Sequence, residues 1–245
     1  PFIREFTHHS THFDKSDPTA EIKGCMIRGA QLSVQAYLRE VESYLNDHHP
    51  FHDEVLHYKE LRFKGTDSIG SGRHVFDAVV FCEGSDVSFN PWFKDLPFKP
   101  AKGETLDLEL NQDPGTNILN SGIWVLPLGE NRVRVGSTYD WSGSTPGPTQ
   151  RAKSELLSKL EKLLPDCRVL RVISHQAGIR PCSHDRRPYL GRHPKHPRLY
   201  IFNGLGSKGS MMAPWCARKL VDHWENQVDL PMDTDIQRLK AFRIK

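Results

Sequence analysis

The hydrophobic positions in the first part of the chain change from helical spacing to the pattern of buried strands. After Ser33, a candidate N-cap, apolar residues recur at i, i+3, i+4 and i+7 through residues 34–45, which predicts an amphipathic helix. Strands are predicted at residues 55–63 and 74–82. Because residues 78–82 are apolar or neutral without a break, we expect the second strand to be buried on both faces of a parallel sheet.

The middle of the chain has alternating positions, which are typical of strands with one face in water. Leucines alternate with acidic residues over residues 106–110. Residues 122–128 and 132–138 flank a Gly-Glu-Asn turn and predict a β-hairpin. A leucine-rich helix is predicted from Thr149 to the proline that stops it, and a strand follows at residues 168–174.

The last part of the chain returns to a buried strand and a helix. Residues 198–203 predict the strand, and an apolar stripe from Ala213 to Trp224 predicts the helix. The order is therefore α/β, then a mostly antiparallel section, then α/β again. This order favours an α/β fold in which a nucleotide-binding type of domain is interrupted by a second domain.

A glycine loop lies between the last predicted strand and the last predicted helix. Residues 204–209 match the dinucleotide-binding pattern G-x-G-x-x-G. The residues after Gly209 predict a helix and a polar tail with no second strand, so we do not expect a complete βαβ unit here. Two interpretations stay open: a tight turn without a ligand, or a backbone and helix N-terminus that contact an electron-rich group.

Composition and charge narrow the classes of partner. The 245 residues carry a formal net charge of +3, and the cations are spread along the chain, which argues against a nucleic-acid partner. Five cysteines without a C-x-x-C pair argue against a disulfide framework or a zinc cluster and favour the cytoplasm. No apolar run is long enough to cross a membrane. His8, His9 and His12 have metal-binding spacing, but without a cysteine or carboxylate pattern we expect no metal.

Several motifs in register resemble one enzyme family. Residues 177–194 (AGIRPCSHDRRPYLGRHP) resemble the signature A-G-[LI]-R-P-x-x-x-D-x-x-P-x-[IL]-G of glycine oxidase and its relatives. Upstream, residues 79–84 resemble the V-V-x-A-x-G strand end, and residues 102–104 resemble the R-G-Q/E turn. Residues 125–127 and 133–138 resemble the Y-x-x-P and G-A-T hairpin. The chain thus resembles the D-amino-acid oxidase and glycine oxidase superfamily of FAD-dependent oxidoreductases.

The resemblance covers residues 20–228 and implies an incomplete FAD-binding Rossmann-like domain interrupted by an antiparallel-sheet substrate domain. Residues 1–91 would form part of the FAD-binding domain with N-terminal strands of the substrate domain. Residues 92–176 would form the substrate domain, and residues 177–245 would return to the FAD-binding domain and its C-terminal helix. Leu128 stands where the family commonly has an arginine, which separates the chain from glycine oxidase itself.

The family's FAD-binding domain starts with a strand and a G-x-G-x-x-G turn, and residues 1–30 contain no counterpart of this element. We therefore expect an N-terminal segment of the same protein before Pro1, which would act as a partner of this chain at the FAD site. The alternative is a divergent protein without FAD. With only residues 204–209 near the flavin, the chain alone is expected to bind FAD weakly.

The resemblance also implies the site residues. Arg180 would be the catalytic and substrate-binding residue that holds a carboxylate with paired hydrogen bonds; the alternative is a structural arginine paired with an acid. Trp124, Tyr139 and Lys208 would also contact the substrate, although the two aromatic residues could equally belong to the core and Lys208 could be an exposed lysine. The residues expected to face the cofactor are Gly84, Gly103, Gly204, Leu205, Gly206, Ser207, Lys208 and Gly209.

The resemblance implies oxidation of an amine or amino acid by hydride transfer to FAD. No Ser-His-Asp or Cys-His arrangement is evident, which is compatible with a reaction carried by a flavin. The expected partner is therefore a small-molecule amine or amino acid. Two alternatives stay open: a non-catalytic binding or scaffold protein that keeps the fold, and a tRNA-modifying flavoenzyme.

Overall fold

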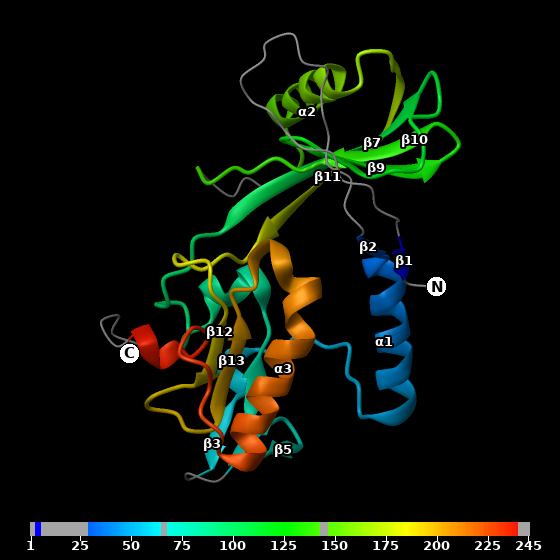
Figure 1. Ribbon diagram of the computed structural model, residues 1–245. Coiled ribbons are helices and arrows are strands. Elements are labelled where there is room, and N and C mark those ends of the chain that lie inside the picture. Colours follow the sequence, from blue (N-terminus) through cyan, green and yellow to red (C-terminus); the bar gives the residue numbers. More distant parts are fainter. Residues whose placement is uncertain (1–2, 6–28, 65–67, 143–146, 240–245) are drawn as a thin grey trace. The chain divides into compact units, whose positions relative to one another are not determined.

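The computed structural model describes residues 3–5, 29–64, 68–142 and 147–239, and the chain divides into two compact units, Pro1–Val55 and Leu56–Lys245 (Figure 1). In the first unit, strands β1 (Ile3–Glu5) and β2 (Ala30–Leu32) pair antiparallel and precede helix α1 (Val34–His48). The remaining helices and strands belong to the second unit.

Helix α1 confirms the helix predicted from the apolar spacing after Ser33. Ser33 is its N-cap residue, although its side chain makes no capping hydrogen bond. None of the helix residues is buried, and Val34, Tyr37, Leu38 and Tyr44 are all exposed. The apolar stripe of α1 is thus formed as expected but is not packed into a core within its own unit.

A five-stranded antiparallel sheet forms one part of the second unit. Its order is β11-β7-β10-β9-β8, with bounds β7 (Ala101–Leu110), β8 (Leu119–Asn120), β9 (Trp124–Gly129), β10 (Arg132–Gly136) and β11 (Val169–Arg180). Helix α2 (Gln150–Leu163) lies across one face of this sheet (Figure 1). The helix was predicted to start at Thr149, and the Oγ1 atom of this residue accepts a hydrogen bond from the backbone N–H of Ala152, which caps the helix.

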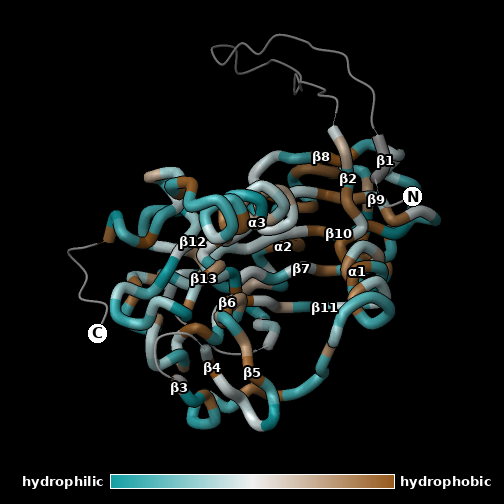
Figure 2. Tube along the Cα trace, turned by 90° about the horizontal axis from the view of Figure 1, so that it is seen from below, coloured by the Kyte–Doolittle hydropathy of each residue, from teal (hydrophilic) through white to brown (hydrophobic). Residues whose placement is uncertain are grey.

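The alternation along β7 decides which face of this sheet is buried. Leu106, Leu108 and Leu110 are fully buried against α2. Asp107 and Glu109 lie on the other face and form ion pairs with arginines of β10 and β11. Figure 2 shows hydrophobic positions along these strands and hydrophilic positions in the loops that connect them. The predicted hairpin and the one-sided strand are thus confirmed.

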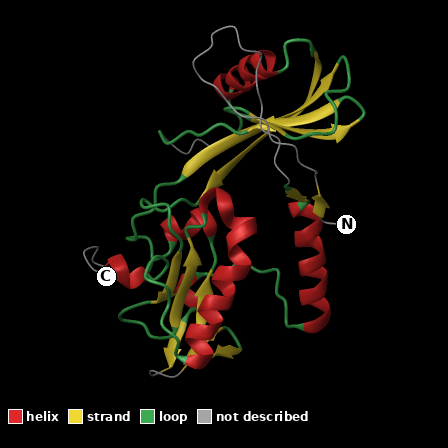
Figure 3. Cartoon of the chain, in the orientation of Figure 1, coloured by secondary structure: helices red, strands yellow, loops and turns green. Residues whose placement is uncertain are grey.

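A smaller sheet of mixed direction forms the other part of the second unit. Its order is β12-β13-β6, with bounds β6 (Val79–Phe81), β12 (Tyr189–Arg192) and β13 (Leu199–Asn203). Strands β6 and β13 are parallel, with Leu199 opposite Val79, although the whole five-stranded sheet lies between them in the sequence. Helix α3 (Gly209–Asn226) follows β13 after a glycine loop (Figure 3). An α/β fold interrupted by an antiparallel sheet is therefore observed.

Two strand predictions are wrong in detail. Residues 55–63 do not form a strand: a 3-10 helix, Tyr58–Glu60, precedes the short strand β3 (Arg62–Lys64). Residues 74–82 divide into β5 (His74–Phe76) and β6, because β5 pairs antiparallel with β4 (Ser68–Ser71) in a separate sheet. Only β6 enters the parallel pair. Pairing between distant strands, which a local pattern does not contain, decides both outcomes.

No helix in the described ranges is both long and apolar enough to cross a bilayer. In the same ranges, no group of three or more His, Cys, Asp or Glu side chains is arranged to hold a metal ion. His8, His9 and His12 lie outside the residues that the structure describes.

Candidate active site

Three loops of the second unit meet around a cavity of about 370 Å³. The loops follow β10, β11 and β13, and the lining residues are Tyr139, Trp141, Cys182, Arg186, Gly204, Leu205, Gly206, Ser207 and Lys208. Most residues of the predicted glycine loop, together with Tyr139, therefore surround one space. A second cavity, of about 450 Å³, lies near the start of β13 and contains none of the predicted site residues.

Arg180 is the last residue of β11. It does not line the cavity itself, but its guanidinium group lies over the ring of Tyr139, which does. Its guanidinium carbon is 4.2 Å from the centre of the Tyr139 ring. Nη2 donates a hydrogen bond to Ser137 Oγ at 2.6 Å, and Nη1 donates to the carbonyl of Thr138 at 3.3 Å. In the described part of the chain no carboxylate forms an ion pair with Arg180, and the side chain is half-buried. A guanidinium has five N–H donors, so donors remain for a ligand.

Gly103 provides the space that the guanidinium of Arg180 occupies. It lies on β7 opposite Gly178 of β11, two residues before Arg180. A Cβ atom at Gly103 would overlap the guanidinium group. Gly103 was predicted to face the cofactor. In the structure its Cα lies against the guanidinium group of Arg180.

The glycine loop connects β13 to α3 through backbone conformations that favour glycine. Gly204 has φ +75° and Gly206 has φ +55°. A Cβ atom at Gly206 would lie 3.2 Å from Cys182 Sγ, and the N–H of Gly206 donates to the carbonyl of Pro181. The loop is therefore held close to the end of β11, and Ser207 and Lys208 remain exposed.

The carboxyl ends of the two parallel strands bring further predicted glycines together. Gly84 follows β6, and Gly204 follows β13. The side chain of Asn203 joins them: Nδ2 donates to the carbonyl of Gly84 at 2.9 Å, and Oδ1 accepts from the N–H of Gly204 at 2.8 Å. Ligands of α/β sheets bind outside the carboxyl ends of the strands, so this edge is the expected place for a cofactor.

Trp124 is not brought to the cavity. Its half-buried ring covers Gly136 of the neighbouring strand, where a Cβ atom would approach the ring at 2.8 Å. Thr105 contacts the same glycine from the other side. The residue lies on the same sheet as Arg180 but does not line the space between the three loops.

Trp141, Cys182 and Arg186 line the cavity but were not predicted from the sequence. The Trp141 ring stacks on that of Tyr139 with centroids 6.2 Å apart, and Lys99 Nζ lies 5.4 Å from its centre. The alternation of aromatic residues in Tyr-Asp-Trp was the available signal for Trp141. Burial raises the pKa of the Cys182 thiol, although the charges of Arg180 and Arg186 act in the opposite direction.

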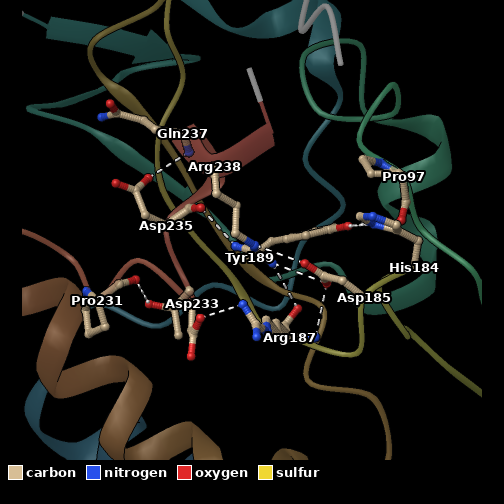
Figure 4. A network of polar contacts seen from close by, with 11 residues as sticks. Pro97, His184, Asp185, Arg187, Tyr189, Pro231, Asp233, Asp235, Gln237 and Arg238 are labelled. Atoms are coloured by element: carbon tan, nitrogen blue, oxygen red, sulfur yellow. Dashed lines mark hydrogen bonds and ion pairs between the residues drawn. The ribbon is translucent and has the colours of Figure 1, made fainter. Parts of the chain in front are cut away.

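Asp185 fixes the loop that carries Cys182 and Arg186 (Figure 4). Its carboxylate accepts a hydrogen bond from the N–H of Arg187 and forms an ion pair with Arg238, with Nε 3.0 Å from Oδ2. Burial by itself would raise the pKa of Asp185, but these bonds lower it below the usual value. Asp185 therefore holds the turn in shape through these contacts.

A buried polar cluster next to β11, the strand that ends in Arg180, was also not predicted from the sequence. Lys102 Nζ lies 3.0 Å from Glu104 Oε1, and His175 Nε2 lies 2.8 Å from Glu104 Oε2. Glu104 also accepts hydrogen bonds from the N–H and the hydroxyl of Thr149. Burial opposes ionisation of Glu104, but the bonds from Thr149 and Lys102 lower its pKa. The group joins β7, β11 and the start of α2, and so supports the strand that ends in Arg180.

A sequence profile of the family described as FAD dependent oxidoreductase (DAO) matches residues 14–223. The chain belongs to this family. The DAO family depends on FAD, and the glycine loop at the N-terminus of α3 fits part of such a cofactor. Backbone N–H groups and the helix dipole at this position favour an electron-rich group.

Curated DAO relatives include glycine oxidases. The glycine oxidase of Pseudomonas aeruginosa is 30% identical over 149 residues, which are 60% of this chain and 41% of that protein. The glycine oxidase of Bacillus subtilis is 30% identical over 206 residues, which are 79% of this chain and 52% of that protein. The chain therefore spans about half the length of the curated relatives it matches.

A solved structure shows the same fold. The iminodiacetate oxidase from Chelativorans sp. BNC1 matches with a TM-score of 0.68 at 22% identity, covering 84% of this chain and 59% of that chain. The antiparallel sheet and the parallel pair therefore form part of a DAO fold.

Proposed function

We propose that the protein oxidises a small amine or amino acid and transfers hydride to FAD, with Arg180 as the residue that binds the substrate carboxylate. One observation carries the proposal: Arg180 has no acidic partner in the described residues and lies on the ring of Tyr139, which lines the cavity of the glycine loop. A planar guanidinium with free donors matches a carboxylate with two parallel hydrogen bonds.

The residues around Arg180 have the role of holding its orientation. Ser137 and Thr138 each accept one hydrogen bond from it, and the ring of Tyr139 covers one face of its guanidinium group. Gly103 leaves the space behind it. A side chain fixed in this way loses less conformational entropy when a ligand binds, and this favours both affinity and a defined substrate orientation.

The glycine loop and Gly84 have the role of contacting the cofactor. FAD, when bound, supplies the hydride acceptor. The backbone of residues 204–209 and the N-terminus of α3 would hold an electron-rich edge of the cofactor, and Gly84 would border the same edge of the sheet. Tyr139 and Lys208 would contact the substrate from the cavity wall, whereas Trp124, which does not line the cavity, is left out of the proposed site.

The proposal is tested on the FAD-loaded protein by replacing Arg180 with methionine and with lysine. Loss of a bidentate clamp is worth roughly 2–4 kcal/mol. We expect Arg180→Met to raise the KM for carboxylate substrates about 30-fold or more, and Arg180→Lys to have a smaller effect because it keeps the charge. Arg192→Met is the matched control, because Arg192 lies at the other cavity.

The substrate series is glycine, sarcosine and D-alanine, each compared with the corresponding amine that lacks the carboxylate. If Arg180 binds the carboxylate, Arg180→Met removes the preference for the amino acid over the amine. An unchanged KM in Arg180→Met would remove the residue from the site. Flavin that is bound but is not reduced by any of these compounds would favour the binding-protein alternative.

A further inference from the structure

The cavity of the proposed active site has more positive charge than one substrate carboxylate requires. Arg186 and Lys208 line it from two different loops, and Arg180 and Lys99 lie against its two aromatic walls. None of the residues that line the cavity is acidic. Within the described ranges, neither Arg186 nor Lys208 forms an ion pair with a carboxylate.

The acidic residues nearest in the sequence are already engaged. Asp140, between the two aromatic residues, accepts hydrogen bonds from the N–H and the hydroxyl of Ser142. Asp185, next to Arg186, is paired with Arg238. Neither carboxylate forms an ion pair with Arg186 or Lys208, so the cationic side chains that line the cavity favour anionic ligands.

The backbone conformation of Arg186 also supports a binding role for this residue. Arg186 has φ +59°, a conformation that favours glycine and is unfavourable for a residue with a Cβ atom. Its N–H donates to the carbonyl of Ser183, which closes the turn and places the residue at the cavity. A long cation in a position where glycine is the more stable choice is an outlier of the kind that concentrates at functional sites.

We infer that the substrate carries a second carboxylate, which Arg186 and Lys208 bind. This inference rests on the proposed function, since it assigns the first carboxylate, next to the amine, to Arg180. The cavity volume of about 370 Å³ is within the usual range for small-molecule sites, roughly 300–1,000 Å³. The substrate class is thus an acidic amino acid or an amino acid with an N-carboxyalkyl group.

The test uses ligands that have no amine and so cannot be oxidised. Succinate and glutarate are compared with their monoamides, succinamate and glutaramate, which have nearly the same shape and one charge fewer. Dissociation constants for the FAD-loaded protein are measured by isothermal titration calorimetry. We expect each dicarboxylate to bind about 10-fold more tightly than its monoamide, as one additional charge-assisted bond would give, and this ratio to fall as salt increases.

Variants test whether Arg186 and Lys208 cause the difference in affinity between each dicarboxylate and its monoamide. In the double variant Arg186→Gln and Lys208→Gln, we expect the ratio to approach one, whereas Arg180→Met should weaken both members of a pair and keep the ratio. Arg192→Gln is the matched control and should change neither. Arg186→Gly removes the cation and relieves the unfavourable backbone conformation, so it should unfold at a higher temperature and still lose most of the ratio.

A ratio near one in the unchanged protein would overturn the inference, as would a ratio that persists in the double variant. These outcomes do not depend on oxidation. Failure of the proposed function would instead appear as flavin that no amine reduces, whatever the ligands of this test show.

Discussion

Gly103 and Arg180 show how one residue without a side chain permits the position of another. The sequence pointed to both residues through separate motifs, and the resemblance assigned them to the cofactor and the substrate. It could not show that they touch, because their contact arises from the pairing of β7 with β11. Gly103 is therefore connected to the proposed substrate only through Arg180.

Replacing Gly103 with alanine should displace Arg180 and cost little stability. The new methyl group would occupy the space of the guanidinium group, which is the far end of a flexible side chain and can move. We expect carboxylate ligands to bind about 10-fold more weakly, which corresponds to roughly 1.4 kcal/mol, while the urea midpoint of unfolding changes little. Ligand affinity by calorimetry and urea unfolding measure the two effects.

Gly178→Ala is the control for this prediction. Gly178 lies opposite Gly103 on the neighbouring strand, and a Cβ atom there would have no atom within 4 Å. The Gly178→Ala variant should therefore bind carboxylate ligands as tightly as the unchanged protein does. Equal affinities in both alanine variants would mean that Gly103 does not position Arg180.

At the scale of elements, local pattern was sufficient where an element contains its own signal. Helix α2 has its cap at Thr149 and its leucine stripe within a few turns, and it was predicted almost to its bounds. Strand β11 was predicted only over residues 168–174, yet it continues to Arg180. Its last residues include polar side chains and Gly178, and they are strand because they pair with β7.

The buried group around Glu104 should make the stability of these elements depend on pH. The pKa of Glu104 is lower in the folded protein than its usual value, so its contribution is present above that usual value and is lost as pH falls through the folded pKa. Glu104→Gln removes this contribution and leaves Lys102 buried with an unbalanced charge. We expect a loss of about 3–5 kcal/mol near neutral pH, as for other broken buried pairs.

The difference in unfolding free energy between the unchanged protein and Glu104→Gln should therefore narrow as pH falls, in urea unfolding at a series of pH values. Glu109→Gln is the control. Glu109 lies on the solvent-facing side of the same strand, where it pairs with the exposed Arg171. Such surface pairs contribute about 0–1 kcal/mol. A constant difference at all pH values would show that Glu104 does not carry this dependence.

At the scale of the whole molecule, the order of patterns predicted the class of fold. Strands with buried faces before and after an antiparallel section indicated an interrupted α/β arrangement, and β6 and β13 do pair across it. The domain bounds at residues 91/92 and 176/177 stay a prediction, and β11 runs through the second of them. The pattern of hydrophobic and polar positions did not predict that three loops meet at one cavity, because loop positions depend on contacts between distant parts of the chain.

The candidate site was accordingly predicted in part. Motif resemblance indicated Arg180, Tyr139 and the glycine loop, and these lie at or against one cavity. It did not indicate Trp141 or Arg186, which the folding of the loops brings to the same place. The sequence thus pointed to Arg180, Tyr139 and the glycine loop, and the structure added Trp141 and Arg186 at the same cavity.

The proposed function requires that amine oxidation reduces the flavin of this protein by transfer of the Cα hydrogen. Its most direct test is anaerobic rapid mixing of the FAD-loaded protein with an amino acid in ordinary and Cα-deuterated form, followed by the absorbance of the oxidised flavin. We expect the flavin to be reduced without oxygen, and more slowly by the deuterated compound. We also expect Arg180→Met to require much higher amino-acid concentrations for the same rate. A flavin that remains oxidised with every amine and amino acid of the series would contradict the proposed function.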